Sequence, residues 1–461
     1  KNYSLEEAFK VAVDLHIKNK IIDAEKVYNQ IIKAKPDFFL AYSNLGIIFS
    51  QRKNYDKAIE LFKKTLEINP NYPDAHNNLG NVYFEQSDFD KSITSYNKAV
   101  NLNKNFSDAY NNLGNVYLKK KNIKLAIENY NKAISLDSQS PKDKPFFNLG
   151  NLYREENKLD ESIECYKKAI SINPASVDSF INLSIALNKN GKLNEAIVAC
   201  EKAISIDPSK VQALNNLGEF NQEIGNDGLA INCYKKALLI EPNNLRSKWL
   251  EMNTFPIIYK DSNQIDSYKE NFEKKIDEIE RFISEKKNFL KKDILNALSS
   301  STNFYLHYNG KDITNLQKKY SSLVSKLTEK IYPNLKKKIE LNKKPKIIKI
   351  GFISSHIREH VIMKLFKNWI ININSEKFKT FVYHSSSKID NTTRLIKDAS
   401  HVFYNNVDTD ELVNKIYSDQ LDILIYLDIG MDPKIQILAS LRLASIQCCA
   451  YGVPVTSGFN S

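Results

Sequence analysis

The chain has 461 residues, of which 42% are apolar, 26% charged and 11% aromatic. These values are typical of a globular protein with a large core and exclude the disordered and collagen-like classes. The length predicts several domains. No apolar stretch approaches the ~18 residues that a membrane-spanning helix needs, and the opening KNYSLEEAFK lacks the apolar centre of a secretory signal.

The cysteines and the charge exclude further classes of site. The five cysteines form neither a metal-ligand spacing nor a disulfide framework, so we expect no metal and a reducing, cytoplasmic location. The net charge of +12 is concentrated in lysines around residues 336–349. We interpret this cluster as a solvated connector, with a phosphate-binding patch as the alternative. Because no aromatic residues alternate with these lysines, a nucleic-acid role is disfavoured.

An internal repeat dominates residues 1–259. Asn-Leu-Gly recurs at 44–46, 78–80, 112–114, 148–150 and 216–218, and Asn-Leu-Ser stands at 182–184. Alanine precedes four of the motifs (Ala41, Ala75, Ala109 and Ala213), an Ala-Ile or Ser-Ile pair and then an aromatic residue or cysteine follow each motif, and proline often ends the unit. This ~34-residue period is the tetratricopeptide pattern, in which each unit is a pair of antiparallel helices. We expect further helix pairs at about 5–35 and 245–259.

The asparagine of the motif occupies one position in every first helix of these pairs, and first helices line the concave side of such superhelices. A carboxamide both donates and accepts hydrogen bonds, so a row of them can bind a peptide backbone irrespective of its side chains. We therefore predict that acceptor polypeptide binds to Asn44, Asn78, Asn112, Asn148, Asn182 and Asn216. The alternative is that these asparagines only satisfy local polar groups.

The pattern changes twice after the repeats. Residues 260–345 read as charged amphipathic helices (Ser267–Ser300 and Thr314–Tyr332), and we expect a basic helical linker region. In residues 346–461, apolar β-branched segments at 346–354, 378–386, 401–405, 421–427 and 445–452 alternate with helical segments. Such alternation predicts a parallel, doubly wound sheet.

Ligands bind at the carboxyl ends of the strands in such sheets. The segments that follow the strands carry polar side chains there: Ser354, Ser355, His356 and His360 after the first strand, Asp428 after the fourth, and Gly452, Pro454, Thr456, Ser457 and Gly458 after the fifth. The first strand is not followed by G-x-G-x-x-G, and the chain has no P-loop, H-E-x-x-H or nucleophile elbow. A dinucleotide-binding fingerprint is therefore absent.

Tetratricopeptide repeats with N-L-G, followed by IGFISSHIREH and LRLASIQCCAYGVPVTSG, resemble the O-linked N-acetylglucosamine transferase family, in particular its bacterial SPINDLY-like branch. The resemblance implies an all-α superhelix followed by the first Rossmann-like half of a glycosyltransferase of the GT-B type. It implies that His360 is catalytic, as base or acceptor-side contact, and that the polar residues after the strands line the substrate cleft. No cofactor or metal is implied.

The resemblance further implies transfer of N-acetylglucosamine from UDP-N-acetylglucosamine to Ser or Thr hydroxyls of proteins. In the family most donor contacts lie in a second Rossmann half, so we expect the chain to be a fragment that is inactive alone.

The chain departs from the family pattern at two places: Val361-Ile362-Met363 follow the histidine, and Ser445 stands where proline is usual. Two alternatives stay open: an interaction scaffold without catalysis, and a glucosyltransferase that transfers glucose from UDP-glucose to Asn. His356 is the local competitor of His360, and a purely structural role for His360, capping or packing the next helix, is the other interpretation.

Overall fold

The computed structural model describes residues 4–137, 141–286, 288–308, 310–336, 347–405, 408–429 and 431–450. The chain divides into two compact units, Lys1–Ala196 and Ile197–Ser461. Helices are the sole regular elements described in the first unit, and the second unit combines helices with a parallel sheet. Among the described residues, no helix combines the length and the apolar character needed to cross a membrane.

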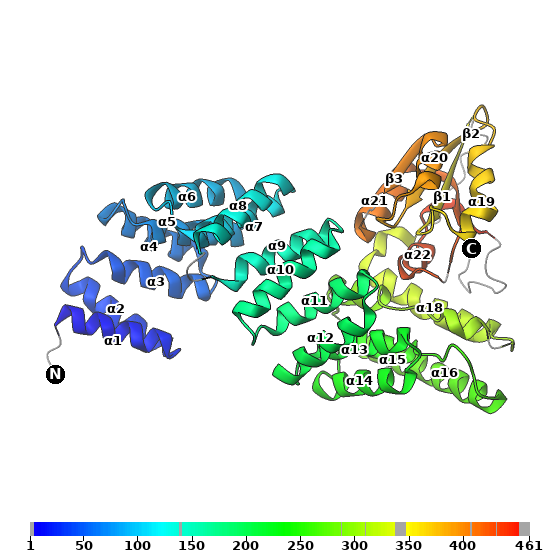
Figure 1. The fold of residues 1–461 in the computed structure, drawn as a ribbon, viewed down its shortest axis with the longest axis horizontal. Coiled ribbons are helices and arrows are strands. Elements are labelled where there is room, and N and C mark those ends of the chain that lie inside the picture. The colour runs from blue at the N-terminus through cyan, green and yellow to red at the C-terminus, as the bar shows by residue number, and fades with distance from the viewer. Residues whose placement is uncertain are drawn as a thin grey trace. The chain divides into compact units, whose positions relative to one another are not determined.

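The first unit is a succession of antiparallel helix pairs, coloured blue to cyan-green in Figure 1. Its helices are α1 (Leu5–Ile17), α2 (Ile21–Ala34), α3 (Phe39–Gln51), α4 (Tyr55–Ile68), α5 (Pro73–Glu85), α6 (Phe89–Leu102), α7 (Ser107–Lys119), α8 (Ile123–Leu136), α9 (Asp143–Glu155), α10 (Leu159–Ile172) and α11 (Val177–Lys189), and α12 (Leu193–Ile206) runs across the limit of the two units. The predicted tetratricopeptide superhelix is confirmed, including the pair before the first Asn-Leu-Gly.

The glycine of the motif lets the two helices of a pair approach closely. A Cβ atom on Gly114 would lie 2.5 Å from Cε1 of Tyr130, whose ring is fully buried between α7 and α8. The same close approach joins Gly80 to Tyr96 and Gly150 to Tyr166. Since real carbon atoms do not pack at such distances, the Leu-Gly and aromatic positions of the repeat belong to one packing unit.

The second unit continues with α13 (Val211–Glu223), α14 (Asp227–Ile240) and α15 (Leu245–Met252), followed by α16 (Ser262–Glu285), α17 (Lys291–Leu298), η1 (Phe304–Tyr308), α18 (Thr314–Ile331) and η2 (Pro333–Lys336). The helices α15 to α18 enclose one apolar core around Trp249 and Tyr320, both fully buried. The Tyr320 hydroxyl donates to Oε1 of Gln436 at 3.1 Å, so this helical region packs against the α/β part. It is a structural layer with its own core, which the expectation of a linker did not foresee.

The sheet contains five parallel strands in the order β3-β2-β1-β4-β5. They are β1 (Ile348–Ser354), β2 (Phe378–His384), β3 (Val402–Asn405), β4 (Leu421–Tyr426) and β5 (Ala444–Cys449), separated by α19 (Val361–Ile371), α20 (Asn391–Ala399), α21 (Thr409–Asp419) and α22 (Pro433–Ala439). This confirms the predicted doubly wound sheet and all five expected strands.

Alternate residues of β1 to β4 enter two different cores, whereas β5 is buried only at Ala444. On one face, Ile353 and Tyr383 pack with Leu412 of α21 and Leu438 of α22. On the other face, Phe352 packs with apolar residues of α19 and α20. The strands β1, β2 and β4 are therefore covered on both sides, as their nearly continuous apolar sequences require.

Candidate functional site

The carboxyl ends of β1 and β4 meet at the point where the strand order reverses. From β1 the chain proceeds to β2 and β3 on one side, and then returns to place β4 on the other side of β1. A crevice outside such a switch point is where ligands bind in doubly wound sheets. Ser354 ends β1, and Asp428 follows β4 by two residues, so both stand at this edge.

Asp428 is the centre of the polar cluster at this edge. Its side chain is fully buried, and its Oδ2 atom accepts from the Ser354 hydroxyl at 3.0 Å, the Ser355 hydroxyl at 3.1 Å and the Ser355 backbone N–H at 3.2 Å. Nδ1 of His356 lies 2.8 Å from the same oxygen. A buried carboxylate needs such donors to offset the loss of its hydration. Oδ1 of Asp428 is buried and has no hydrogen-bond partner in the described part of the chain.

The rings of the two histidines after β1 are in close, tilted contact. The ring centroids of His356 and His360 are 4.2 Å apart, with an angle of 32° between the planes. The His356 side chain is 19% exposed. His360 is the N-cap of α19, and its Nδ1 atom accepts from the backbone N–H of Ile362 at 3.3 Å. The capping role considered for His360 is thus present in the structure, beside the position that the cluster gives it.

The surroundings change two pKa values in the cluster. Burial lowers the pKa of His360, and the nearby His356 and Arg358 lower it further, while the Asp428 carboxylate acts in the opposite direction. Burial and the charge of Asp428 raise the pKa of Asp432, which follows in the same loop. A neutral His360 is therefore favoured at neutral pH.

Of the sequence-predicted cleft residues, the structure brings together Ser354, Ser355, His356, His360 and Asp428. Gly452, Pro454, Thr456, Ser457 and Gly458 lie outside the described residues. Within the described ranges, His, Cys, Asp and Glu side chains form no group of three or more suited to a metal ion. What the arrangement offers is a carboxylate-held imidazole beside a second imidazole, which is suited to proton transfer or hydrogen bonding.

The predicted row of asparagines is largely used for contacts between neighbouring repeats. Nδ2 of Asn112 donates to Oδ1 of Asn77 and of Asn81, both at 3.1 Å. Equivalent bonds run from Asn148 to Asn111 at 2.9 Å and from Asn182 to Asn151 at 3.2 Å, and Asn44 donates to the Tyr28 hydroxyl at 3.2 Å. The side chain of Asn78, on α5, makes no hydrogen bond to the described residues.

These bonds occupy only one end of each carboxamide. No described side chain or backbone group donates to Oδ1 of Asn112, Asn148 or Asn182, and these three residues are half-buried. Asn216 differs: it is 3% exposed, its Oδ1 accepts from Arg246 at 3.4 Å, and its Nδ2 is buried without a partner among the described residues. Asn216 therefore does not stand on an open surface, contrary to its place in the predicted row.

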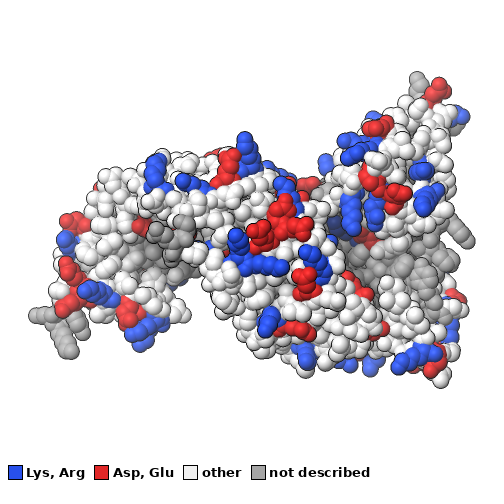
Figure 2. All heavy atoms as spheres, in the orientation of Figure 1, with Lys and Arg blue, Asp and Glu red and all other residues white. Residues whose placement is uncertain are grey.

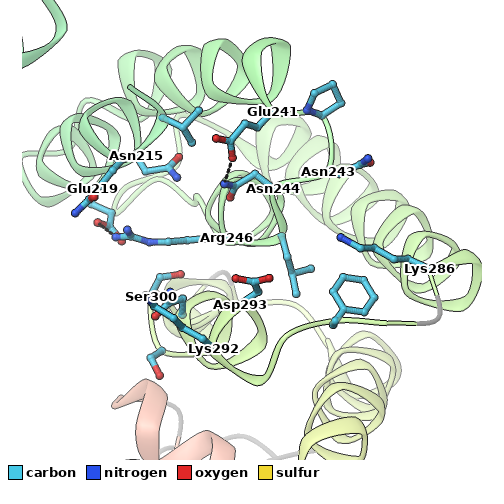
Figure 3. Close-up of a pocket in the computed structure, with 17 residues that line it drawn as sticks. Asn215, Glu219, Glu241, Asn243, Asn244, Arg246, Lys286, Lys292, Asp293 and Ser300 are labelled. Carbon is cyan, nitrogen blue, oxygen red and sulfur yellow. Dashed lines mark hydrogen bonds and ion pairs between the residues drawn. The ribbon is translucent and has the colours of Figure 1, made fainter. Parts of the chain in front are cut away.

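A pocket of about 980 Å³ lies in the second unit, and Arg246, the partner of Asn216, is one of its lining residues (Figure 3). It is formed by α13, the segment 241–244, α15, and the segment 286–300 with α17. Arg246 pairs with Glu219 at 2.7 Å on one wall, and Asn244 donates to Glu241 at 2.7 Å on another. Its carboxamides are Gln212, Asn215, Asn243, Asn244 and Asn296, and none of them was selected from the sequence.

Sequence reasoning also missed the acceptors of the inter-repeat bonds. Oδ1 of Asn81 accepts from both Asn112 and the Tyr96 hydroxyl, at 3.1 and 2.7 Å, and Asn151 does the same for Asn182 and Tyr166. The sequence held a signal for these acceptors, because asparagine directly follows Leu-Gly at 81, 115 and 151.

Basic and acidic side chains are intermingled over the first unit on the face that Figure 2 shows. Most of the lysine cluster lies outside the described residues, and Lys349 donates to the Asp419 carbonyl at 3.0 Å.

Comparison with known proteins supports the assignment of the helix pairs as tetratricopeptide repeats. Models described as TPR repeat match residues 48–87, 80–121 and 150–191, and models described as tetratricopeptide repeat match residues 107–140, 177–210 and 211–244. The chain is thus a tetratricopeptide repeat protein over these residues. No curated protein sequence matches it.

Among solved structures, the chain is similar to the Cut9–Hcn1 hetero-tetramer of the APC/C (18% identity, TM-score 0.45, covering 54% of this chain and 49% of that one). It is also similar to an O-GlcNAc transferase variant of Thermobaculum terrenum (17% identity, TM-score 0.43, 62% and 52%). A third is YrrB, a TPR protein with an unusual peptide-binding site (22% identity, TM-score 0.34, 40% and 95%). The chain spans about half the length of the first two.

Proposed function

We propose that the chain belongs to a protein glycosyltransferase that transfers N-acetylglucosamine from UDP-N-acetylglucosamine to Ser or Thr hydroxyls, with the repeats binding the acceptor polypeptide. The observation that carries the proposal is the cluster of His356, His360 and Asp428 at the switch point of the sheet. The resemblance of IGFISSHIREH and LRLASIQCCAYGVPVTSG to the transferase family supports it.

The chemistry explains why such a cluster is useful. A hydroxyl is a weak nucleophile at neutral pH, so its proton must be accepted as its oxygen bonds to the anomeric carbon and UDP departs. A neutral imidazole can accept that proton, and the cluster holds two imidazoles, His356 and His360, of which His360 is the residue that the resemblance assigns to catalysis. Ser354 and Ser355, which bond to Asp428, would lie beside the reacting groups.

Free acceptor atoms on the repeats support polypeptide binding. Oδ1 atoms of Asn112, Asn148 and Asn182 receive no bond from the described residues and can accept from peptide N–H groups, whereas the Nδ2 atoms are already used. In the second unit, the carboxamides that line the pocket of Figure 3 offer both donors and acceptors. Polypeptide would thus bind through these atoms, with little preference for its side chains.

The test is a transfer assay on the complete natural protein with radiolabelled UDP-N-acetylglucosamine and a mixture of cytoplasmic proteins. We expect label on Ser or Thr, and a loss of at least about 10²-fold in the double variant His356→Ala/His360→Ala. The melting temperature of that variant is the control for folding. UDP-glucose is assayed in parallel. Transfer of glucose to Asn would replace the proposal by the N-glucosyltransferase, and transfer of neither sugar would favour the scaffold.

A further inference from the structure

The hydrogen bonds of the two histidines distinguish their tautomers. Asp428 accepts from Ser354 and from Ser355 through the same Oδ2 atom that faces Nδ1 of His356 at 2.8 Å. The Ser355 hydroxyl also lies 2.9 Å from Nδ1 of His356, but its one proton is donated to Asp428. Because an ionised carboxylate only accepts hydrogen bonds, Nδ1 of His356 carries the proton and donates it to Asp428. A neutral imidazole protonated on Nδ1 keeps the lone pair on Nε2. His356 therefore presents a basic nitrogen on the edge of its ring away from Asp428.

The neighbouring ring has the opposite arrangement. Nδ1 of His360 accepts the backbone N–H of Ile362, the second residue of α19. A nitrogen that accepts a hydrogen bond carries no proton, so the neutral ring of His360 is protonated on Nε2 and is a donor there. Acceptance of a substrate proton at Nε2 of His360 would require the ring to release the α19 cap first.

We propose that His356, held by Asp428, accepts the proton of the acceptor hydroxyl, and that His360 donates a hydrogen bond from Nε2 to the acceptor or sugar oxygen. This inference rests on the proposed function and divides its chemistry between the two rings. The hydroxyl oxygen forms the bond to the anomeric carbon, and the bond from that carbon to UDP breaks with its electron pair on UDP. The hydroxyl proton moves to Nε2 of His356.

The burial of Asp428 explains why this arrangement favours proton acceptance. The carboxylate has no solvent exposure, and its Oδ1 atom lacks a partner among the described residues, so the contact with Nδ1 of His356 is shielded from water. His356 itself is 19% exposed, which leaves its ring accessible from outside. The carboxylate thus orients the ring and stabilises the cation that forms.

The first measurement needs no activity. In the 461-residue chain labelled with ¹⁵N-histidine, long-range ¹H–¹⁵N spectra distinguish the two tautomers. We expect Nδ1–H for His356 and Nε2–H for His360, with the signals assigned by His356→Gln and His360→Gln. Asp428→Asn should reduce the Nδ1–H population of His356. His16→Gln, which alters a histidine on α1, should leave both signals unchanged. The reverse tautomers would overturn the assignment.

The second measurement is single-turnover transfer by the complete natural protein. We expect His356→Gln and Asp428→Asn to lose about 10²–10⁴-fold in rate. His360→Gln, which keeps an N–H donor, should stay within about tenfold of the wild type. Wild-type rates for His356→Gln would overturn the inference while the proposed function stands. Absence of transfer by the wild-type protein would instead overturn the proposed function, and with it the proton-accepting role of His356. The spectra would show separately whether Asp428 and His356 form the hydrogen-bonded pair.

Discussion

Asn112 donates a hydrogen bond to Oδ1 of Asn81 in the preceding repeat, at 3.1 Å. The same oxygen accepts the hydroxyl of Tyr96, which is 2% exposed, at 2.7 Å. One carboxamide oxygen therefore joins the helix pair α5 and α6 to α7 of the next pair. Asn151 repeats the arrangement with Tyr166 and Asn182. Part of the predicted peptide-binding row is thus also a set of bonds along the superhelix.

Replacing Asn81 should lower the free energy of unfolding of the helix repeats. Asn81→Ala removes the acceptor of the buried Tyr96 hydroxyl and one of the two acceptors of Asn112, and an unsatisfied buried donor costs about 1–3 kcal/mol. We expect a lower urea midpoint, followed by circular dichroism. Asn78→Ala is the matched control on the same helix, because the side chain of Asn78 makes no hydrogen bond to the described residues. Equal midpoints for the two variants would contradict the structural role of Asn81.

Asn78 also tests the peptide-binding proposal without disturbing these bonds. If the row of carboxamides binds polypeptide, Asn78→Ala should weaken binding to unrelated extended peptides by about 0.5–1.5 kcal/mol, or about two- to tenfold in Kd. Asn97→Ala, on the exposed part of α6 in the same repeat, is the control. Fluorescence anisotropy with labelled peptides measures both. An unchanged Kd for Asn78→Ala would remove this residue from the binding surface.

The Leu-Gly motif predicts a steric effect. Gly114→Ala would place Cβ 2.5 Å from the buried ring of Tyr130, and overpacking of this kind costs about 1–3 kcal/mol. Gly228, within α14, has no atom within 4 Å of an added Cβ, so Gly228→Ala should be neutral or stabilising by up to about 1 kcal/mol. Thermal unfolding of both variants measures the difference. A melting temperature for Gly114→Ala equal to that of the wild type would mean that Tyr130 can move aside.

The fold was accessible from the sequence because its patterns are periodic. The spacing of Leu-Gly and its aromatic partner predicts the helix pairs, and the apolar strands predict the sheet, since each pattern reports which side of an element is buried. The geometry of the candidate site was harder to predict from the sequence. The pairing of Asp428 with His356 joins residues 72 positions apart, and the capping bond that determines the tautomer of His360 depends on the local backbone. Likewise, the burial of Asn216 could not be read from a motif that it shares with half-buried asparagines.

His307 should make folding stability depend on pH. It lies in η1, and burial lowers its pKa from 6.5 to about 4. Its Nδ1 atom is buried without a partner in the described ranges, so the neutral ring is the form that the fold accommodates. Between pH 6.5 and 4 the unfolded chain binds a proton that the folded chain excludes. The stabilisation is therefore complete above pH 6.5 and is lost as the pH falls toward 4.

The expected loss over this window is about 1–3 kcal/mol, allowing for the incomplete burial of the ring. Asp227 opposes it, because burial raises the pKa of its carboxyl to about 6 and its contribution falls as the pH rises. The measurement is therefore a difference between the wild type and His307→Gln, in which the contribution of Asp227 cancels. Urea midpoints are measured for both proteins at pH 7.0, 5.5 and 4.5. Where His307→Gln is the less stable protein at pH 7.0, the two midpoints should converge as the pH falls, because only the wild type loses the contribution of His307. A constant difference across the three pH values would show that His307 titrates normally in the folded protein.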